Sequence, residues 1–253
     1  MTTVDPPPFF ILGCVRSGTT MLRDLLRSVP GLCCPEETHF YRWAQPYGTR
    51  QFEQNYRKNA VLAHHREIDG VTEDEMGALL DTARTRREFT DQYMALFREK
   101  QGLSADTRWF DKTPQNVYCV SLLAVDYPDS RFVHITRDPR NVVASLAVGK
   151  VMKVDSVVGA ANYWREAEIL AAEFERANPL RMLTVSYRDL TNDPVTVVRR
   201  ICRFVDIELV PAEELGKVRH ERNAYVDVLD PDALALVEEI CGPVARELGY
   251  NFS

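Results

Sequence analysis

The stretch Phe10–Leu26, FILGCVRSGTTMLRDLL, combines three kinds of segment in a fixed order. Its apolar run stops at Gly13, a short polar loop ends at Thr20, and leucines then recur at helical spacing. A continuous apolar run of this length is typical of a strand that is buried on both faces of a parallel sheet. The stretch therefore predicts a buried strand, a tight loop and an amphipathic helix.

A loop of this kind points several backbone N–H groups at one place, where the dipole of the following helix adds partial positive charge. Gly13 and Gly18 allow the turn and the close approach of an anion. The loop also supplies one cation and three hydroxyls: Arg16, Ser17, Thr19 and Thr20. A plain strand–turn–helix with a threonine cap is the simpler interpretation, but the coincidence of these groups at a helix start favours an anion site.

The residue after Gly18 bears on which anion is bound. Nucleoside triphosphates are held by the loop G-x-x-x-x-G-K-[ST]. Gly13 and Gly18 have that separation, but Thr19 stands where the lysine belongs. A triphosphate site also uses Mg²⁺, for which Asp111 and Asp138 are the candidate ligands. A P-loop kinase or ATPase is therefore an alternative, not the preferred interpretation.

Composition excludes several classes of protein. The 253 residues carry a net charge of −6, and 45% of them are hydrophobic. This suits a domain with a proper core and argues against a broad nucleic-acid interface. The N-terminal MTTVDPPP does not read as a secretory signal, and no apolar run is long enough to span a bilayer, so we expect a soluble, cytoplasmic chain. The six cysteines show no ligand spacing, so we expect no metal site.

Four β-like runs alternate with helical patterns along the chain. Strands are expected at Phe9–Gly13, Arg108–Asp111, Arg131–Thr136 and Arg181–Ser186. Helices are expected at Thr19–Ser28, Gln115–Val125, Pro139–Val148, Asp155–Ala177, Asp193–Phe204 and Asp232–Leu248, with two or three more from Gln51 to Lys100. This alternation predicts an α/β fold whose P-loop-like core is a mostly parallel sheet flanked by helices. We predict a single domain over residues 1–253, with a helical insertion at 51–100 over the carboxyl edge of the sheet.

Three further clusters are expected at the same sheet edge. In RFVHITRDPRNVVAS, Arg137 ends a strand and Ser145 lies two turns into the next helix, so the pair can close on a second phosphate. In WFDKTPQN, Lys112 lies just past a strand end. In PEETHF, Glu36 and Glu37 return towards the cationic loop, where a carboxylate is expected to pair with a cation or to take a proton. Each cluster alone also fits an ordinary solvated turn or strand end.

Together these four pieces resemble the sulfotransferase family that uses 3′-phosphoadenosine 5′-phosphosulfate (PAPS). RSGTT after an apolar strand looks like the family's 5′-phosphosulfate loop, and RDPRNVVAS looks like its 3′-phosphate motif. VSYRDLTNDP looks like its tyrosine-containing segment after a late strand. The motifs occur in family order from Phe9 to Val205, and RSGTTMLRDLLRSVPGLCCPEET looks closest to the tyrosylprotein sulfotransferase branch and its bacterial relatives.

The resemblance implies a role for each matching residue. Glu37 would be the base, while Lys112 and Arg16 would stabilise the charge that develops on the leaving 5′-phosphate. The donor PAPS would be bound by Arg16, Ser17, Gly18, Thr19, Thr20, Arg137, Ser145 and Tyr187. Asp111 and Asp138 would need only structural roles, as an ion-pair partner and a helix cap. The family's C-terminal Arg-Lys-Gly clamp has no match, and its candidate replacements are Lys217, Arg219 and Arg222.

The implied reaction moves a sulfuryl group from PAPS to an acceptor hydroxyl, by in-line transfer without a metal. The acceptor is left open between a tyrosine or phenol, a sugar and another alcohol, and the oligomeric state is also open. Six aromatic residues suggest an apolar or aromatic-walled acceptor cleft, although core packing is the more common role for any one of them: Phe40, Tyr41, Trp43, Tyr47, Phe52 and Tyr56. A non-catalytic nucleotide-binding module is a further alternative, although binding alone would need neither Glu37 nor Lys112.

Overall fold

The computed structural model describes residues 6–41, 45–149, 152–208, 218 and 221–252 of the chain. The described residues form a five-stranded sheet in which all neighbouring strands are parallel. In spatial order the strands are β2 Leu32–Cys33, β3 Arg108–Lys112, β1 Phe9–Leu12, β4 Arg131–Thr136 and β5 Met182–Ser186. The four predicted strands and the mostly parallel sheet are confirmed. Strand β2 was not predicted, because two residues are too few for a recognisable pattern.

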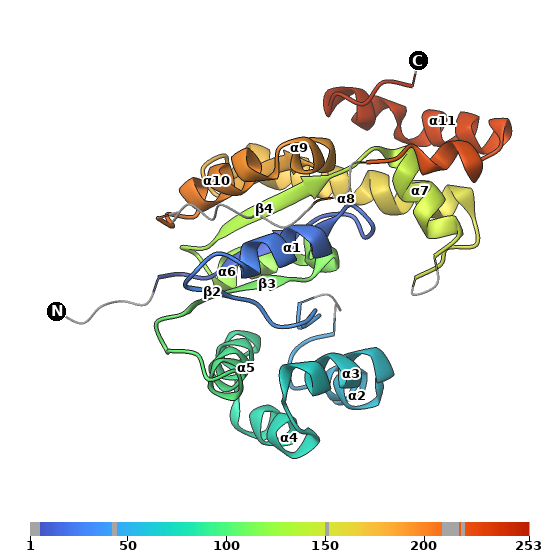
Figure 1. Ribbon diagram of the computed structural model, residues 1–253. Coiled ribbons are helices and arrows are strands. Elements are labelled where there is room, and N and C mark those ends of the chain that lie inside the picture. The colour runs from blue at the N-terminus through green and yellow to red at the C-terminus, as the bar shows by residue number, and fades with distance from the viewer. Residues whose placement is uncertain (1–5, 42–44, 150–151, 209–217, 219–220, 253) are drawn as a thin grey trace.

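Helices cover both faces of the sheet (Figure 1). One face carries α1 Thr19–Arg27, α9 Tyr187–Asn192 and α10 Pro194–Phe204, and the other carries α6 Val120–Asp126 and α8 Val157–Ala177. Two further helices, α7 Pro139–Ala147 and α11 Pro231–Glu247, pack against α8. A short 3₁₀ helix, Ala224–Asp227, contacts α7. Within the described residues, no helix is both long and apolar enough to cross a membrane.

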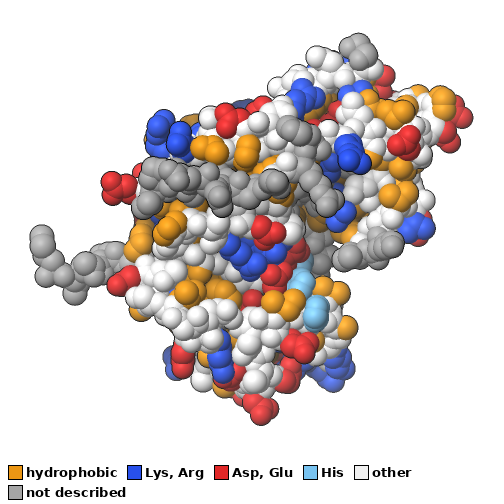
Figure 2. All heavy atoms as spheres, in the orientation of Figure 1, with side chains coloured by type: hydrophobic (Ala, Val, Ile, Leu, Met, Phe, Trp, Pro, Cys, Tyr) orange, Lys and Arg blue, Asp and Glu red, His pale blue; other side chains and the backbone are white. Residues whose placement is uncertain are grey.

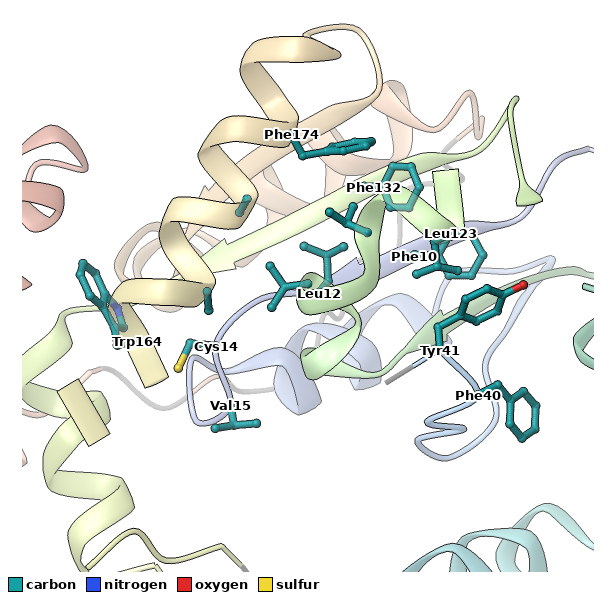
Figure 3. Packing of buried hydrophobic residues seen from close by; sticks show 14 of the residues in the cluster. Phe10, Leu12, Cys14, Val15, Phe40, Tyr41, Leu123, Phe132, Trp164 and Phe174 are labelled. Carbon is teal, nitrogen blue, oxygen red and sulfur yellow. The ribbon is translucent and has the colours of Figure 1, made fainter. Parts of the chain in front are cut away.

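Strand β1 is buried on both faces, as its continuous apolar run predicts. Phe9 and Ile11 belong to the core that contains the leucines of α1. Phe10 and Leu12 belong to the other core, where α8 contributes Trp164 among others (Figure 3). Each face of this central strand therefore anchors one layer of helices, and the loop that follows β1 starts from a fixed position.

The parallel register brings the chemically important residues to one edge of the sheet. Ile11 of β1 lies opposite Lys112 of β3, and Leu12 lies opposite His134 of β4. Because all strands point the same way, the loop after β1, the end of β3 and Arg137 after β4 meet at the carboxyl edge. This is the edge at which open α/β sheets bind ligands.

Residues 50–100 form four helices, so the prediction of two or three was wrong. They are α2 Arg50–Lys58, α3 Ala60–Asp69, α4 Glu73–Thr82 and α5 Arg86–Lys100. Each helix begins at its own capping side chain: Thr49, Asn59, Thr72 and Thr85. The apolar spacing of this polar region did not show these separate helix starts. In Figure 1 the four helices lie together beyond the β2 edge of the sheet. Their assignment as an insertion within one domain stays a prediction.

The helix predicted at Gln115–Val125 is in fact two elements. Pro114–Cys119 is a 3₁₀ helix, and α6 begins only at Val120. The backbone N–H of Asn116 donates to Thr113 three residues back, while its side chain donates to Asp111 at 2.7 Å. This side-chain contact stabilises the 3₁₀ turn that follows β3, the strand that ends at Lys112.

Truncating Leu22 tests how firmly α1 is anchored to the sheet. Leu22 is fully buried, so Leu22→Ala should lower the free energy of unfolding by about 2–5 kcal/mol, through lost apolar burial and a residual cavity. Leu122 of α6 is 43% exposed and serves as the matched control. Leu122→Ala should change the free energy of unfolding by less than about 1 kcal/mol. Urea unfolding followed by circular dichroism measures both. Equal losses would show that α1 is not held by its buried face.

Candidate active site

Neighbouring protein atoms leave no room for a Cβ at either glycine of the β1–α1 loop. A Cβ at Gly13 would lie 2.5 Å from the carbonyl oxygen of Ile135 in β4. Gly18 has φ +97°, and a Cβ there would lie 2.2 Å from the ring of Tyr187. We predicted that these glycines allow the close approach of an anion. In the structure, the groups that approach them are a strand backbone and an aromatic ring.

The amino end of α1 has hydrogen-bond donors without side-chain partners. Gly18 is the N-cap residue, and no side chain in the described part of the chain makes a capping hydrogen bond, so the threonine cap considered above does not form. The Ser17 hydroxyl is fully buried and has no hydrogen-bond partner among the described residues. Thr19 is buried and Thr20 is exposed at the same turn. The first-turn N–H groups and this hydroxyl suit an anion placed at the helix start.

Arg16 links the two predicted phosphate motifs. Its Nε donates to Ser145 Oγ at 2.9 Å, and its backbone carbonyl accepts from Arg137 Nη1 at 3.1 Å. The backbone of Arg16 is left-handed at φ +69°, a conformation that costs a non-glycine residue about 1–2 kcal/mol. The fold thus brings Arg16, Arg137 and Ser145 together, although they come from two loops and a helix.

Tyr187 closes the site from the direction of β5. It is the first residue of α9, and its ring lies against Gly18. The guanidinium of Arg137 lies over the same ring, 4.3 Å from its centroid. The predicted adenine-side tyrosine is therefore adjacent to both phosphate motifs.

Arg137 contacts a carboxylate that was not predicted from the sequence. Arg137 Nε donates to Glu221 Oε1 at 2.9 Å, and Asn141 Nδ2 donates to the same oxygen at 3.1 Å. Glu221 lies 84 residues from Arg137, so no local pattern could have paired them. The proposed 3′-phosphate cation already holds a protein carboxylate.

The candidates for a C-terminal phosphate clamp gain little support from the structure. Arg222 is exposed, and its neighbour Glu221 is the residue that contacts Arg137. Lys217 and Arg219 lie outside the described residues.

Lys112 and Glu37 form an ion pair at the carboxyl edge of the sheet. Lys112 Nζ lies 2.5 Å from Glu37 Oε1 and 3.3 Å from Thr20 Oγ1. The lysine side chain is 1% exposed, whereas that of Glu37 is 24% exposed. An amine this deeply buried needs a counter-charge, and the carboxylate supplies it from a segment that is otherwise far along the chain.

His39 contacts the second oxygen of the same carboxylate. Its Nε2 lies 3.3 Å from Glu37 Oε2. Burial alone would raise the pKa of the Glu37 carboxyl, but the hydrogen bond from His39 and the charge of Lys112 outweigh it and lower the pKa to about 2. Glu37 is therefore ionised throughout the neutral range. No role was predicted for His39, although its position two residues after Glu37 was a usable signal.

The two adjacent glutamates have separate roles. Glu36 accepts from Arg23 at 2.6 Å and from Arg27 at 3.2 Å, and its backbone N–H donates to Asp69. These two arginines lie on α1, over which Figure 2 shows basic and acidic side chains side by side. Glu36 thus ties the segment to the outer side of α1, while Glu37 faces the loop.

Asp111 and Asp138 have structural surroundings. Asp138 caps α7 and pairs with Arg140, as the cap prediction required. Asp111 makes no ion pair with any residue that the structure describes, contrary to the prediction; it accepts hydrogen bonds from Thr38, Thr113 and Asn116. Burial raises its pKa to about 6, and the hydroxyl donors offset only part of this effect. Among the described residues, no three His, Cys, Asp or Glu side chains are grouped so as to hold a metal ion.

Most of the aromatic residues considered for the acceptor cleft are core residues, the alternative that was favoured for each of them. Four of them are at most 2% exposed and form part of the hydrophobic core: Phe40, Tyr41, Phe52 and Tyr56. Phe40 packs edge-on against Phe89 and Tyr93 of α5 (ring centroids 4.7 and 4.9 Å apart), so these rings join the helical region to the sheet. Tyr47 is half-buried, and Trp43 lies outside the described residues.

The candidate site lines a cavity of about 280 Å³. Its walls include the loop and the facing side chains, among them Arg16, Gly18, Thr20, Glu37, Arg137 and Tyr187. A larger hollow, of about 620 Å³, lies near Pro7 and Arg108, away from this edge. The guanidinium groups of Arg98 and Arg108 there donate to backbone carbonyls.

The sequences of several known proteins align with nearly the whole chain. A protein-tyrosine sulfotransferase of Drosophila melanogaster is 25% identical over 263 aligned residues, which cover 96% of this chain and 50% of that protein. Protein-tyrosine sulfotransferase A of Caenorhabditis elegans is 23% identical, with 97% of this chain and 67% of that protein covered. The chain thus spans half the length of the first relative and two thirds of the second.

Solved structures share the fold. The sulfotransferase domain from the Synechococcus PCC 7002 olefin synthase matches with a TM-score of 0.71 and 22% identity, over 100% of this chain and 98% of that chain. Mouse sulfotransferase SULT7A1 complexed with PAP matches with a TM-score of 0.54 and 10% identity, over 97% and 88%. The model of the sulfotransferase family matches residues 7–211. The chain belongs to the sulfotransferase family.

Proposed function

We propose that this protein transfers a sulfuryl group from PAPS to an acceptor hydroxyl and releases adenosine 3′,5′-bisphosphate. The observation that carries the proposal is the meeting of Glu37, Lys112 and Thr20 at the uncapped start of α1. A carboxylate, a buried ammonium and helix N–H groups at one place supply a base, a cation and an anion cradle. Membership of the sulfotransferase family supports the same reaction.

The residues present fit the 5′-phosphosulfate end of PAPS. The Ser17 hydroxyl is buried without a partner among the described residues, and Thr19 and Thr20 stand at the first turn of α1. Arg16 lies on the same loop and lines the cavity. When bound, PAPS supplies the activated sulfuryl group, whose bond to the 5′-phosphate oxygen breaks as the acceptor oxygen bonds to sulfur. The loop's part is to orient that group.

Glu37 would take the proton of the acceptor hydroxyl. Its low pKa makes it a weak base but keeps it ionised, so proton transfer becomes favourable only as the acceptor oxygen gains its bond to sulfur and grows acidic. No deprotonated acceptor has to exist beforehand. The released proton ends on the Glu37 carboxylate and leaves to solvent, to which that side chain is 24% exposed.

Lys112 and Arg16 would stabilise the charge that develops on the leaving 5′-phosphate. The ammonium of Lys112 has three N–H groups, of which one faces Glu37 and one faces Thr20. The third remains for an oxygen placed at the start of α1. A cation held in a buried place stabilises developing charge more strongly than it would in water.

Arg137 and Ser145 would bind the 3′-phosphate, and Tyr187 would lie on the adenine side. Arg137 and Ser145 are both hydrogen-bonded to Arg16, so an anion between them lies next to the 5′ loop. Glu221 competes for Arg137, and a bound 3′-phosphate would replace or repel it. The acceptor is proposed only as a hydroxyl. Relatives are named for protein tyrosine and for carbohydrate, and both are hydroxyl compounds.

Calorimetric titration of the full chain tests the donor. Adenosine 3′,5′-bisphosphate should bind equally well in EDTA and in Mg²⁺, because Arg137, Arg16 and the loop supply the positive charge. ATP, which has no 3′-phosphate, should bind more weakly. Mg²⁺-dependent ATP binding without bisphosphate binding would instead indicate a P-loop kinase or ATPase. Bisphosphate binding without turnover on any phenol, sugar or alcohol would indicate a binding module.

Replacing the carboxylate tests the base. Glu37→Gln should lower kcat by about 10²–10⁴-fold, because a positioned general base is lost, while the Kd for bisphosphate changes little. Glu36→Gln is the matched control, since Glu36 faces the arginines of α1 and should retain turnover. Thermal unfolding shows whether the unpaired Lys112 impairs folding. Normal turnover by a folded Glu37→Gln variant would remove Glu37 from the mechanism.

Two substitutions should move bisphosphate affinity in opposite directions. Arg137→Ala removes a charge-assisted contact and should weaken binding by about 10- to 100-fold. Glu221→Gln removes the competing negative charge and should strengthen it by about three- to tenfold. Adenosine 5′-monophosphate, which has no 3′-phosphate, is the control ligand and should respond to neither. Equal effects on both nucleotides would contradict the 3′-phosphate assignment.

A further inference from the structure

We propose that His39 is a positioning residue for Glu37: it donates a hydrogen bond from Nε2 to Glu37 Oε2 and so fixes the carboxylate for the acceptor hydroxyl. The inference rests on the proposed role of Glu37 as the base. It concerns a residue to which the resemblance to PAPS-dependent enzymes assigns no role.

The geometry divides the carboxylate between two partners. Oε1 of Glu37 faces Lys112 Nζ at 2.5 Å, and Oε2 faces His39 Nε2 at 3.3 Å. With one oxygen held from β3 and the other from its own segment, the carboxylate cannot rotate without losing a contact. A base held by a second group that touches no substrate is the arrangement found in catalytic triads.

The backbone of His39 is held in place on both sides. Its N–H donates to Thr113 Oγ1 at 3.3 Å, and its carbonyl accepts from the Tyr56 hydroxyl at 2.6 Å. Its φ of +54° lies in the left-handed region, which is costly for a side chain other than glycine. The surrounding contacts offset this strain and turn the imidazole back towards Glu37, two residues earlier.

His65 supports the same arrangement from α3. Its ring is stacked with that of His39, with centroids 6.1 Å apart and an angle of 12° between the planes. Its Nδ1 lies 3.0 Å from the backbone carbonyl oxygen of Glu37. The His39 ring is 6% exposed, so water competes little for its contact with the carboxylate. The two histidines thus hold the Glu37 side chain and backbone together.

The charged and titratable groups around Glu37 set what a pH experiment can show. Lys112 and Asp111 face it from β3, His39 and His65 from the 36–41 segment and α3, and Arg16 shares its cavity. Of these, Lys112 and His39 lower the pKa of Glu37. Loss of the His39 contact should therefore raise it towards its ordinary value and move an acid limb of the rate profile upward.

The test compares three variants at His39 with a control. His39→Ala should lower kcat by about 10- to 100-fold, because the base is misplaced, with little change in the KM for PAPS. His39→Gln places an amide N–H near the position of Nε2 and should restore most of the turnover, whereas His39→Asn, which is too short, should not. His64→Ala on α3 is the matched control, because that histidine is 67% exposed, and it should behave as wild type.

A second readout does not depend on turnover. The titration of the Glu37 carboxyl, followed by carbon-13 NMR of the full chain, should shift upward in His39→Ala and His39→Asn but not in His39→Gln. Equal kcat values for the Gln and Asn variants, or a fall in kcat without a shift in titration, would overturn the proposal. A shift in titration in a chain that sulfates no phenol, sugar or alcohol would support the positioning of Glu37 by His39 and would count against the proposed reaction instead.

Discussion

The ion pair between Lys112 and Glu37 is the constraint on which the rest of the site depends. A lysine that is 1% exposed must be neutralised where it stands, because an unpaired buried charge costs several kcal/mol. The pair pulls the segment after α1 across the carboxyl ends of β1 and β3. It also places the carboxylate, Thr20 and the start of α1 within one cavity. The chain could not move this segment away without leaving an ammonium buried and alone.

Two of the cations in the site already form ion pairs with protein carboxylates. Lys112 holds Glu37, and Arg137 holds Glu221. Such pairing keeps the cations folded inward in a chain with a net charge of −6. At Arg137 an incoming anion would therefore exchange with the Glu221 carboxylate, and would not enter an empty positive pocket. An anion then binds only if it competes better than a carboxylate for the guanidinium. This favours a phosphate at Arg137.

Much of the fold and part of the site could be predicted locally. Four strands and the α/β class followed from apolar runs and helical spacing, since those patterns record which faces are buried. The roles given to Glu37, Lys112 and Arg137 came from motif resemblance and stay proposals, although the fold does bring Glu37 to Lys112 and Arg137 to Arg16. The number of helices in 50–100 was wrong. Of the aromatic residues considered for a cleft, Phe40, Tyr41, Phe52 and Tyr56 belong to the core, which was the favoured alternative.

By itself, the sequence determined the strand, loop and helix of residues 9–27 and the order of the chemical motifs along the chain. Only the tertiary structure decided which partners meet. Glu36 and Glu37 are neighbours in the chain, yet one binds α1 and the other binds Lys112. Asp111 accepts hydrogen bonds from side-chain hydroxyls and an amide, and Glu221 contacts Arg137 from 84 residues away in the chain. Local patterns report burial and backbone conformation, whereas a charge takes its partner from whatever the folded chain brings within about 4 Å.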